Sequence, residues 1–349
     1  MNNNSFFSTE ILRWFRENGR DLPWRETRDP YAIWLSEIIL QQTRIAQGWE
    51  YWERFMQTYP KVEDLAAASE DDVLKLWQGL GYYSRARNLH TAAKQIVALG
   101  AFPNTLEGIK SLKGVGDYTA AAIGSFAFDI PAAVVDGNVY RVLSRYFGID
   151  TPINSTQGKK EFAALAQSLL PASDAASYNQ GMMDFGAIQC TPQSPKCLLC
   201  PLAETCEALR CGRVEELPVK NKTVKVKTRH LSYIYIRCKS SAADDTGKSE
   251  PMVAIHRRGE GDIWQGLWEP YNVSDVKELP SFVKNPILLA KDVKHVLTHR
   301  ILLADFYLLE TESRPSLPDD YIWIKESEIE DYGVPRLIEI MLEKINPAE

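Results

Sequence analysis

Long apolar runs, simple repeats and an excess of positive charge are all missing from this sequence. A membrane-spanning helix needs roughly 18 or more consecutive apolar residues, and no segment of the chain reaches that length. The first residues, Met1 to Ser5, include neither the basic nor the apolar stretch of a secretory signal. These absences exclude a membrane protein and a low-complexity protein. We therefore expect a folded cytoplasmic protein.

The charge balance excludes a protein that coats nucleic acid by bulk charge, because 46 acidic residues outnumber 40 basic ones. Any contact with DNA must therefore be local. Basic side chains gather at two places, Arg13, Arg16, Arg20, Arg25, Arg28 and Arg44, and then Lys220, Lys222, Lys225, Lys227 and Arg229. Such groups are more often a solvated surface than a binding site, so they predict nothing alone.

The chain has 349 residues, which exceeds the usual size of one core, so two domains are expected. Apolar residues recur every three or four positions in the first part, which predicts an all-helical domain over residues 1–213. The clearest segments are 31–45, 71–80, 89–99, 117–128 and 160–170. A polar, lysine-rich connector with Pro218 follows at 214–229.

Residues 230–349 change to an alternating pattern, which predicts a smaller domain of mixed α and β structure. The predicted strands are 231–237, 252–256, 301–309 and 321–324, and a closing helix covers 326–345. The polar segment 239–250 has the composition of a mobile loop, and no chemistry is expected there.

Four of the six cysteines lie within seventeen residues, at Cys190, Cys197, Cys200 and Cys206. Four thiolates suit either zinc or an iron–sulfur cluster. Only one pair has the short spacing that is usual in zinc sites, which favours a cluster over zinc and over four unpaired thiols. Because all four ligands are cysteine, the metal is expected to be structural or electron-transferring. Cys211 and Cys238 are interpreted as ordinary thiols.

Two glycines, Gly114 and Gly116, stand between helical segments, at the place where backbone N–H groups could approach a phosphate. This arrangement is typical of a helix-hairpin-helix over about residues 106–125, which contacts DNA without regard to base sequence. An ordinary tight turn is the alternative interpretation.

Two acidic residues are candidates for catalysis. Glu37 is the sole acid between Tyr31 and Gln47, and its helical neighbours include Ile33, Trp34 and Leu40. Such surroundings raise a carboxyl pKa and suit a general acid, although a surface glutamate is the alternative.

The second acid is Asp136, which precedes a predicted helix. It can cap that helix, stabilise a developing cation, or do both.

Several motifs together resemble the MutY-type adenine DNA glycosylases of the helix-hairpin-helix, iron–sulfur base-excision superfamily. They are RDLPWR at 20–25, SEIILQQT at 36–43, GLGYYSRAR at 79–87, the hairpin, DGN at 136–138 and the cysteine loop. The resemblance implies a mainly α catalytic domain with a six-helix barrel and a 4Fe–4S cluster loop at 190–206. It also implies a Nudix-like α+β domain at 230–349 that recognises 8-oxoguanine.

The resemblance implies a monofunctional glycosylase that flips out adenine mispaired with 8-oxoguanine or guanine in double-stranded DNA and hydrolyses its N-glycosidic bond. Glu37 would be the general acid and base, and Asp136 would stabilise the oxocarbenium-like sugar or bond to it transiently, with support from Tyr118 and Asn138. Related endonuclease III-type enzymes carry a Schiff-base lysine at the position of Tyr118, so strand cutting should be weak.

Further residues receive roles from the same resemblance. The adenine pocket would consist of Arg20, Leu22, Trp24, Arg25 and Asp184. The side chains of Gln42, Thr43 and Tyr82 would lie beside 8-oxoguanine, although core packing is the alternative for Trp24 and Tyr82. A monovalent cation at the hairpin, a monomeric state and a nucleoid-associated location are also expected.

Residues 266–270 (GLWEP) resemble a Nudix signature, but the acidic cluster needed for magnesium-dependent hydrolysis does not follow. Leu297, Thr298 and His299 align with the Phe-Ser-His loop by which the family recognises 8-oxoguanine. Two of the three positions differ. Thr298 keeps a hydroxyl group and His299 is unchanged, whereas Leu297 lacks the phenyl ring, which puts the tightness of that contact in doubt.

Two other functions compete with this interpretation. An endonuclease III-like glycosylase and lyase for oxidised pyrimidines is disfavoured by Tyr118 and by the second domain. A non-catalytic iron–sulfur module that scans DNA is disfavoured because it would not need both Glu37 and Asp136.

Overall fold

The structure is a computed structural model that describes residues 3–221, 226–239, 250–274 and 279–346. The chain divides into two compact units, residues 1–66 with 91–222, and residues 67–90 with 223–349. No helix in these described ranges is long and apolar enough to cross a membrane.

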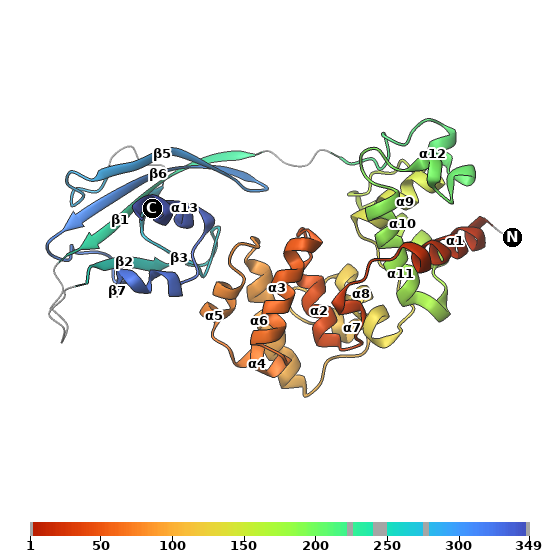
Figure 1. Cartoon of the computed structure of the whole chain (residues 1–349), viewed down its shortest axis with the longest axis horizontal. Coiled ribbons are helices and arrows are strands. Elements are labelled where there is room, and N and C mark those ends of the chain that lie inside the picture. Colours follow the sequence, from red (N-terminus) through yellow and green to blue (C-terminus); the bar gives the residue numbers. More distant parts are fainter. Residues whose placement is uncertain (1–2, 222–225, 240–249, 275–278, 347–349) are drawn as a thin grey trace. The chain divides into compact units, whose positions relative to one another are not determined.

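The first unit is built from helices (Figure 1). They are α1 (Asn3–Asn18), α2 (Pro30–Ile39), α3 (Ile45–Thr58), α4 (Val62–Ala67), α7 (Leu106–Lys110), α8 (Asp117–Phe128), α9 (Gly137–Phe147), α10 (Thr156–Leu169), α11 (Ala175–Asp184) and α12 (Glu207–Arg210). Helix α4 ends at the unit boundary, and α6 (Ser84–Leu99) crosses it. A π-helical turn, Phe185–Gln189, follows α11 directly.

Polar side chains fix where these helices begin. Asp29 accepts a hydrogen bond from the Tyr31 amide at the start of α2, and Pro30 occupies the first helical position. Thr105 and Ser155 cap α7 and α10 in the same way. Helix α9 ends at Gly148, whose φ of 68° belongs to the left-handed region that glycine adopts without strain.

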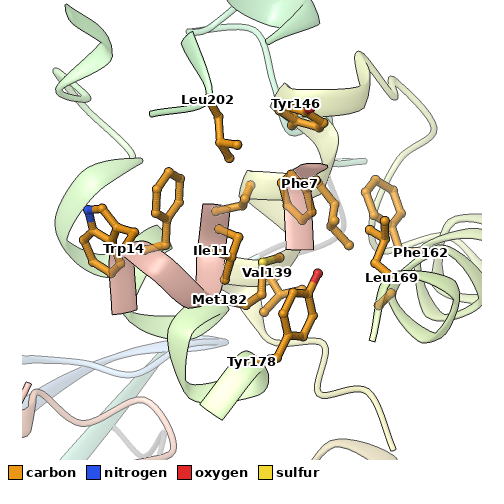
Figure 2. Close-up of a cluster of buried hydrophobic side chains, with 14 of the residues drawn as sticks. Phe7, Ile11, Trp14, Val139, Tyr146, Phe162, Leu169, Tyr178, Met182 and Leu202 are labelled. Carbon is orange, nitrogen blue, oxygen red and sulfur yellow. The ribbon is translucent and has the colours of Figure 1, made fainter. Parts of the chain in front are cut away.

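The main core of the first unit lies between α1, α9, α10 and α11 (Figure 2). Phe7 is fully buried there, with its ring centroid 4.6 Å from that of Tyr146 and 5.6 Å from that of Phe147. Cys190, Cys200 and Cys206 pack against the same core. The cysteine loop is thus attached to the packing that joins the first and last large helices of this unit.

The second unit contains a seven-stranded mixed sheet in the order β3-β2-β1-β6-β5, with β4 paired to β1 and β7 paired to β2. The strands are β1 (Lys227–Cys238), β2 (Met252–Arg257), β3 (Trp268–Glu269), β4 (Tyr271–Ser274), β5 (Ile287–Val296), β6 (Arg300–Thr311) and β7 (Tyr321–Lys325). Strands β1 and β6 are parallel, and Lys227 pairs with Arg300. Helix α13 (Arg336–Ile345) packs on β5 and β6 (Figure 1), and α5 (Glu70–Leu76) belongs to this unit.

The predicted fold class, a helical first part and an α+β second part, is confirmed. The closing helix is shorter than predicted. Residues Glu326–Asp331 form a 3-10 turn and α13 begins after Pro335, because proline disfavours a helical conformation at the residue before it.

Strands β3, β4 and β5 were not predicted, and register shifts near Ala290 interrupt the alternation of β5. Two other interpretations fall partly outside the described residues, namely most of the 239–250 loop and residues 222–225 of the connector.

Replacing Phe7 by Ala should lower the free energy of unfolding by about 3–5 kcal/mol, because the cavity would open between two aromatic rings in a fully buried site. Phe6→Ala is the matched control, since Phe6 is only partly buried against the same core. Urea unfolding followed by circular dichroism measures both losses. Equal losses for the two variants would contradict this packing.

Candidate active site and cysteine loop

Helix α2 holds the Glu37 carboxyl away from water. Every residue from Tyr31 to Ile39 is buried, and Glu37 itself is only 6% exposed. Burial raises its pKa to about 7, against the lowering effect of the hydrogen bond from Tyr118. The Asp136 charge also raises this pKa, and the Arg25 charge lowers it. Near neutral pH the carboxyl is therefore poised to carry a proton.

Tyr118, on the first turn of α8, positions this carboxyl. Its hydroxyl donates a hydrogen bond of 2.8 Å to Glu37 Oε2. Burial, together with the nearby charges of Glu37 and Asp136, raises the pKa of Tyr118 well above its usual value, so the phenol stays protonated and donates. No hydrogen bond from the described residues reaches the other oxygen, Oε1.

Asp136 caps α9. Its carboxylate accepts hydrogen bonds from the Val139 amide (2.7 Å) and from Asn138 Nδ2 (2.8 Å). Burial raises the pKa of Asp136, although both of these donors oppose the rise. The capping role that the sequence suggested is therefore present, and it fixes a partly buried carboxylate near Tyr118 on the hairpin helix.

A hydrogen-bonded path leads from Asp136 to the cysteine loop. Asn138 Oδ1 accepts a bond of 2.7 Å from Arg141 Nη2, and Arg141 Nε donates at 2.7 Å to the Cys190 carbonyl. One turn later, Arg145 Nη1 donates to the Thr191 carbonyl at 2.7 Å and lies 3.4 Å from Cys190 Sγ. Two arginines on α9 thus fasten the first cysteine to the helix that Asp136 starts.

A cavity that is partly open to solvent lies next to Glu37. Its lining residues come from five segments of the first unit and are Arg20, Leu22, Trp24, Arg25, Ile33, Ser36, Glu37, Leu40, Ile45, Phe126, Gln180 and Met183. The ring of Trp24 packs edge-on against Trp49 and Trp52, at centroid distances of 5.8 and 5.6 Å. Trp24 therefore combines the two interpretations offered for it, since it lines the cavity and is also part of the packing.

Asp184 lies behind the lining residues rather than among them, which differs from the position expected in the pocket wall. It is fully buried and accepts hydrogen bonds from Arg25 Nη1 (2.8 Å) and Nη2 (2.9 Å) and from Arg20 Nε (2.9 Å). Burial alone would raise the pKa of Asp184, but the two guanidinium groups lower it. Asp184 therefore holds both arginines in the wall as an anion.

The expected hairpin joins α7 to α8. Gly114 has a φ of 79°, and Gly116 caps α8 with open space on its side-chain face. An added Cβ at Gly116 would meet nothing within 4 Å. The first turn of α8 therefore presents its backbone amides without obstruction, as a phosphate contact requires.

All four clustered cysteines are free and line one pocket, together with Arg145 and Gln189. Burial raises the pKa of Cys200 to about 12, so metal binding must displace the thiol proton. Among the described residues, no three His, Cys, Asp or Glu side chains converge on a point that could hold a single metal ion. Four thiols that line one pocket suit a multi-iron cluster, in which each iron takes one cysteine.

Two of the residues expected to recognise the opposite base meet in the second unit. The Tyr82 and Thr298 hydroxyl groups are 2.6 Å apart. Tyr82 is 47% exposed, so core packing does not account for it. Leu297 packs against the core under α13, and the His299 carbonyl accepts a bond of 3.2 Å from the Lys227 amide.

Gln42 and Thr43 follow α2 in the first unit, where Gln42 has a φ of 57°. Sequence reasoning missed Phe126, Gln180 and Met183 as lining residues. Gln180 and Met183 lie one helical turn apart on α11, just before Asp184. Their closeness in sequence to Asp184 was the one signal that could have identified them.

Comparison with known proteins identifies the family of this chain. A family model described as "HhH-GPD superfamily base excision DNA repair protein" matches residues 35–171. A second, for the iron–sulfur binding domain of endonuclease III, matches 190–206, and a Nudix domain model matches 247–344. A protein of Buchnera aphidicola subsp. Schizaphis graminum (strain Sg) named adenine DNA glycosylase is 30% identical over 97% of this chain and 98% of the relative. The chain belongs to the adenine DNA glycosylase family.

Further matches include another adenine DNA glycosylase and two solved structures. The adenine DNA glycosylase of Mus musculus is 43% identical over 61% of this chain and 44% of that protein. A solved thermostable thymine-DNA glycosylase superposes with a TM-score of 0.56 at 34% identity, over 60% of this chain and 97% of that one. A trapped endonuclease III–DNA intermediate, with a TM-score of 0.53 at 23% identity, shares the fold.

As a member of the adenine DNA glycosylase family, the chain is a DNA-binding hydrolase of base excision repair that acts on an N-glycosyl bond. It carries a 4Fe–4S cluster, and all four clustered cysteines lie within the matched iron–sulfur segment.

The raised pKa of Glu37 makes stability depend on pH. The stability that depends on the neutral Glu37 carboxyl is fully present below the pKa that Glu37 has in the unfolded chain. It is lost as the pH rises through the folded-state pKa of about 7. The side chain of Glu37→Gln cannot ionise. At pH 8 the free energy of unfolding of this variant should therefore be about 3 kcal/mol higher than that of the wild type. This difference should vanish below about pH 4.

Denaturant unfolding of both proteins across this pH range measures the difference. Glu161→Gln, at an exposed site on α10, is the control and should show no such trend. A constant difference between wild type and Glu37→Gln at all pH values would contradict a buried, protonated Glu37.

Proposed function

We propose that this enzyme is a monofunctional glycosylase that removes adenine mispaired with 8-oxoguanine, or with guanine, from double-stranded DNA. The observation that carries the proposal is the Glu37 carboxyl, which is buried, has a pKa of about 7 and lines a cavity that is partly open to solvent. A general acid is most effective when its pKa lies near the working pH.

In the first step, Glu37 donates its proton to N7 of the flipped adenine. Because Tyr118 occupies Oε2, the proton is carried on Oε1. Protonation turns the base into a neutral leaving group, and the electron pair of the breaking C1′–N9 bond leaves with adenine. We assign recognition of the base to the cavity wall, where Arg20 and Arg25 are held by Asp184 and Gln180 offers an amide.

In the second step, the Asp136 carboxylate stabilises the cationic sugar or bonds to it transiently. Asn138 supports Asp136 by its hydrogen bond. Glu37, now ionised, takes a proton from the attacking water, and a hydroxyl group ends on C1′.

Tyr118 is central to the monofunctional assignment. Strand cutting by β-elimination needs an amine that forms a Schiff base with C1′. Tyr118 offers a phenol instead, and the rise in its pKa keeps that phenol neutral. The abasic product should therefore leave with its strand intact.

Regions of the chain receive the following roles. We assign catalysis to residues 1–213. Within them, the hairpin at about 106–125 contacts the DNA backbone and holds a monovalent cation. Residues 214–229 connect the two domains. Residues 230–349, with Gln42, Thr43 and Tyr82, recognise the opposite 8-oxoguanine. When bound by Cys190, Cys197, Cys200 and Cys206, the cluster supplies a cross-link that orders the loop. We propose a monomer that acts at the nucleoid.

Labelled duplexes with adenine opposite 8-oxoguanine, guanine or thymine test the activity. We expect breaks that need alkali with the first two duplexes, and a loss of at least about 100-fold in Glu37→Gln because the general acid is gone. Unchanged DNA binding by this variant is the control for folding. Binding without base release by the wild type would support a scanning module instead, and breaks without alkali would support a lyase.

His299→Ala should reduce the preference for 8-oxoguanine over guanine, because one contact with a base edge contributes about 1–3 kcal/mol of discrimination. Single-turnover rates on the two duplexes measure the preference, and the rate on the guanine duplex is the internal control. Wild-type discrimination in this variant would remove His299 from the recognition role.

A further inference from the structure

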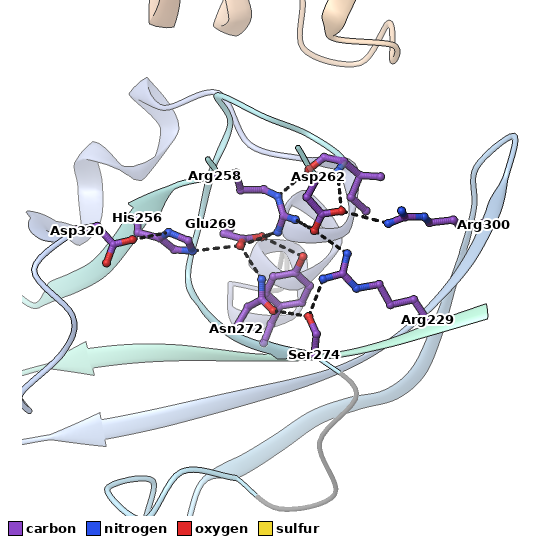
Figure 3. A network of polar contacts seen from close by, with 11 residues as sticks. Arg229, His256, Arg258, Asp262, Glu269, Asn272, Ser274, Arg300 and Asp320 are labelled. Carbon is purple, nitrogen blue, oxygen red and sulfur yellow. Dashed lines mark hydrogen bonds and ion pairs between the residues drawn. The ribbon is translucent and has the colours of Figure 1, made fainter. Parts of the chain in front are cut away.

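A cluster of charged side chains in the second unit plays no part in the chemistry described above (Figure 3). At its centre is Asp262, in the loop between β2 and β3. Its carboxylate accepts hydrogen bonds from Arg229 Nη1 (2.6 Å), Arg258 Nη2 (2.8 Å) and Arg300 Nη1 (3.1 Å). One carboxylate thus binds three guanidinium groups.

The cluster is anchored to the buried part of the domain. Arg258 is 7% exposed and also donates from Nη1 to both oxygens of Glu269, at 2.6 and 2.5 Å. Glu269 is 1% exposed, lies in the Nudix signature segment and accepts a further bond from Tyr233 at 3.1 Å. Asp262 is therefore connected through Arg258 to a buried, hydrogen-bonded carboxylate.

At its other side, Asp262 reaches the turn between β5 and β6. Arg300 is the first residue of β6, and its carbonyl accepts a bond of 2.8 Å from the Leu297 amide. Arg229 stands on the neighbouring parallel strand β1, where it shares a face with Leu231 and Tyr233. Of the two arginines that bind Asp262 from the sheet, Arg300 lies at the base of the turn that carries residues 297–299, and Arg229 lies opposite Leu302, two residues farther along β6.

A second contact supports the same geometry. Trp264, two residues after Asp262, lies with its ring centroid 5.8 Å from that of His295 on β5. Trp264 has a φ of 61°, so the loop holds an unfavourable backbone conformation that surrounding contacts must maintain. The β2–β3 loop therefore contacts both strands that enter the 297–299 turn.

We propose that Asp262 is a positioning residue for the recognition turn at residues 297–299. Its carboxylate fixes Arg300 and Arg229 and so sets where Thr298 and His299 stand. The inference rests on the role given to this turn under Proposed function. Without the carboxylate, Arg258 would keep its contact with Glu269, whereas the ion pairs that Arg229 and Arg300 form with Asp262 would be lost.

Asp262→Asn tests the proposal, because it keeps the volume and removes the charge. Glu260→Gln is the matched control, since Glu260 is an exposed acid in the same loop. Single-turnover excision is measured with adenine opposite 8-oxoguanine and opposite guanine. The change in protein charge is the same for both duplexes, so the ratio of the two rates isolates recognition of the opposite base.

We expect Asp262→Asn to reduce this ratio by about 3- to 10-fold while the rate on the guanine duplex stays unchanged. Glu260→Gln should leave both rates unchanged. In the free protein, hydrogen exchange at the Leu297 amide should be faster in Asp262→Asn than in the wild type, which reports on the turn without any DNA.

The outcomes separate the two proposals. A wild-type enzyme with equal rates on both duplexes would overturn the recognition role itself. A wild-type preference that persists in Asp262→Asn, with unchanged exchange at Leu297, would overturn only the positioning role. If Asp262→Asn fails to fold, Arg300→Gln breaks the same contact at a residue whose side chain is 40% exposed, and the same two readouts apply.

Discussion

Burial of the Glu37 carboxyl is the constraint on which the rest of the catalytic unit depends. A carboxyl in water would be ionised at neutral pH. Burial on the apolar helix α2, together with the charge of Asp136, raises the pKa of Glu37 to about 7 and favours the protonated form. A buried carboxyl needs a hydrogen-bond donor that can stay in place whether the carboxyl is neutral or ionised. The hydroxyl of Tyr118 is such a donor, because its raised pKa keeps it protonated. The pocket, the hairpin helix and the second acid are arranged around this one group.

Much of this site could be predicted from the sequence, because some properties depend on local spacing. The apolar neighbours of Glu37 on one helix face predict its burial, and the spacing of four cysteines predicts a metal loop. Asp136 precedes a helix and caps it. In each case the residues that determine the environment lie within a few positions of the functional side chain, and the common motifs of the family supplied the rest.

Other features could not be predicted, because they depend on segments that are distant in the sequence. Asp184 serves Arg20 and Arg25 from behind the cavity wall, and nothing near residue 184 indicates this placement. The three-arginine contact of Asp262 joins two strands and a loop that the sequence separates by up to 71 residues, from 229 to 300. Strand β5 escaped prediction because its bulges hide the alternation on which strand prediction relies.

The pairing of α1 with α11 has a consequence for synthesis of the chain. Helix α1 packs on α11, and Asp184 at the end of α11 holds Arg20 and Arg25 just after α1. A ribosome that adds roughly 5–20 residues per second needs about 10–30 s to pass from α1 to α11. During that interval the amino-terminal helix is without its partner and the cavity wall lacks its anion. A nascent chain therefore has no assembled adenine pocket until about half of its length has been made.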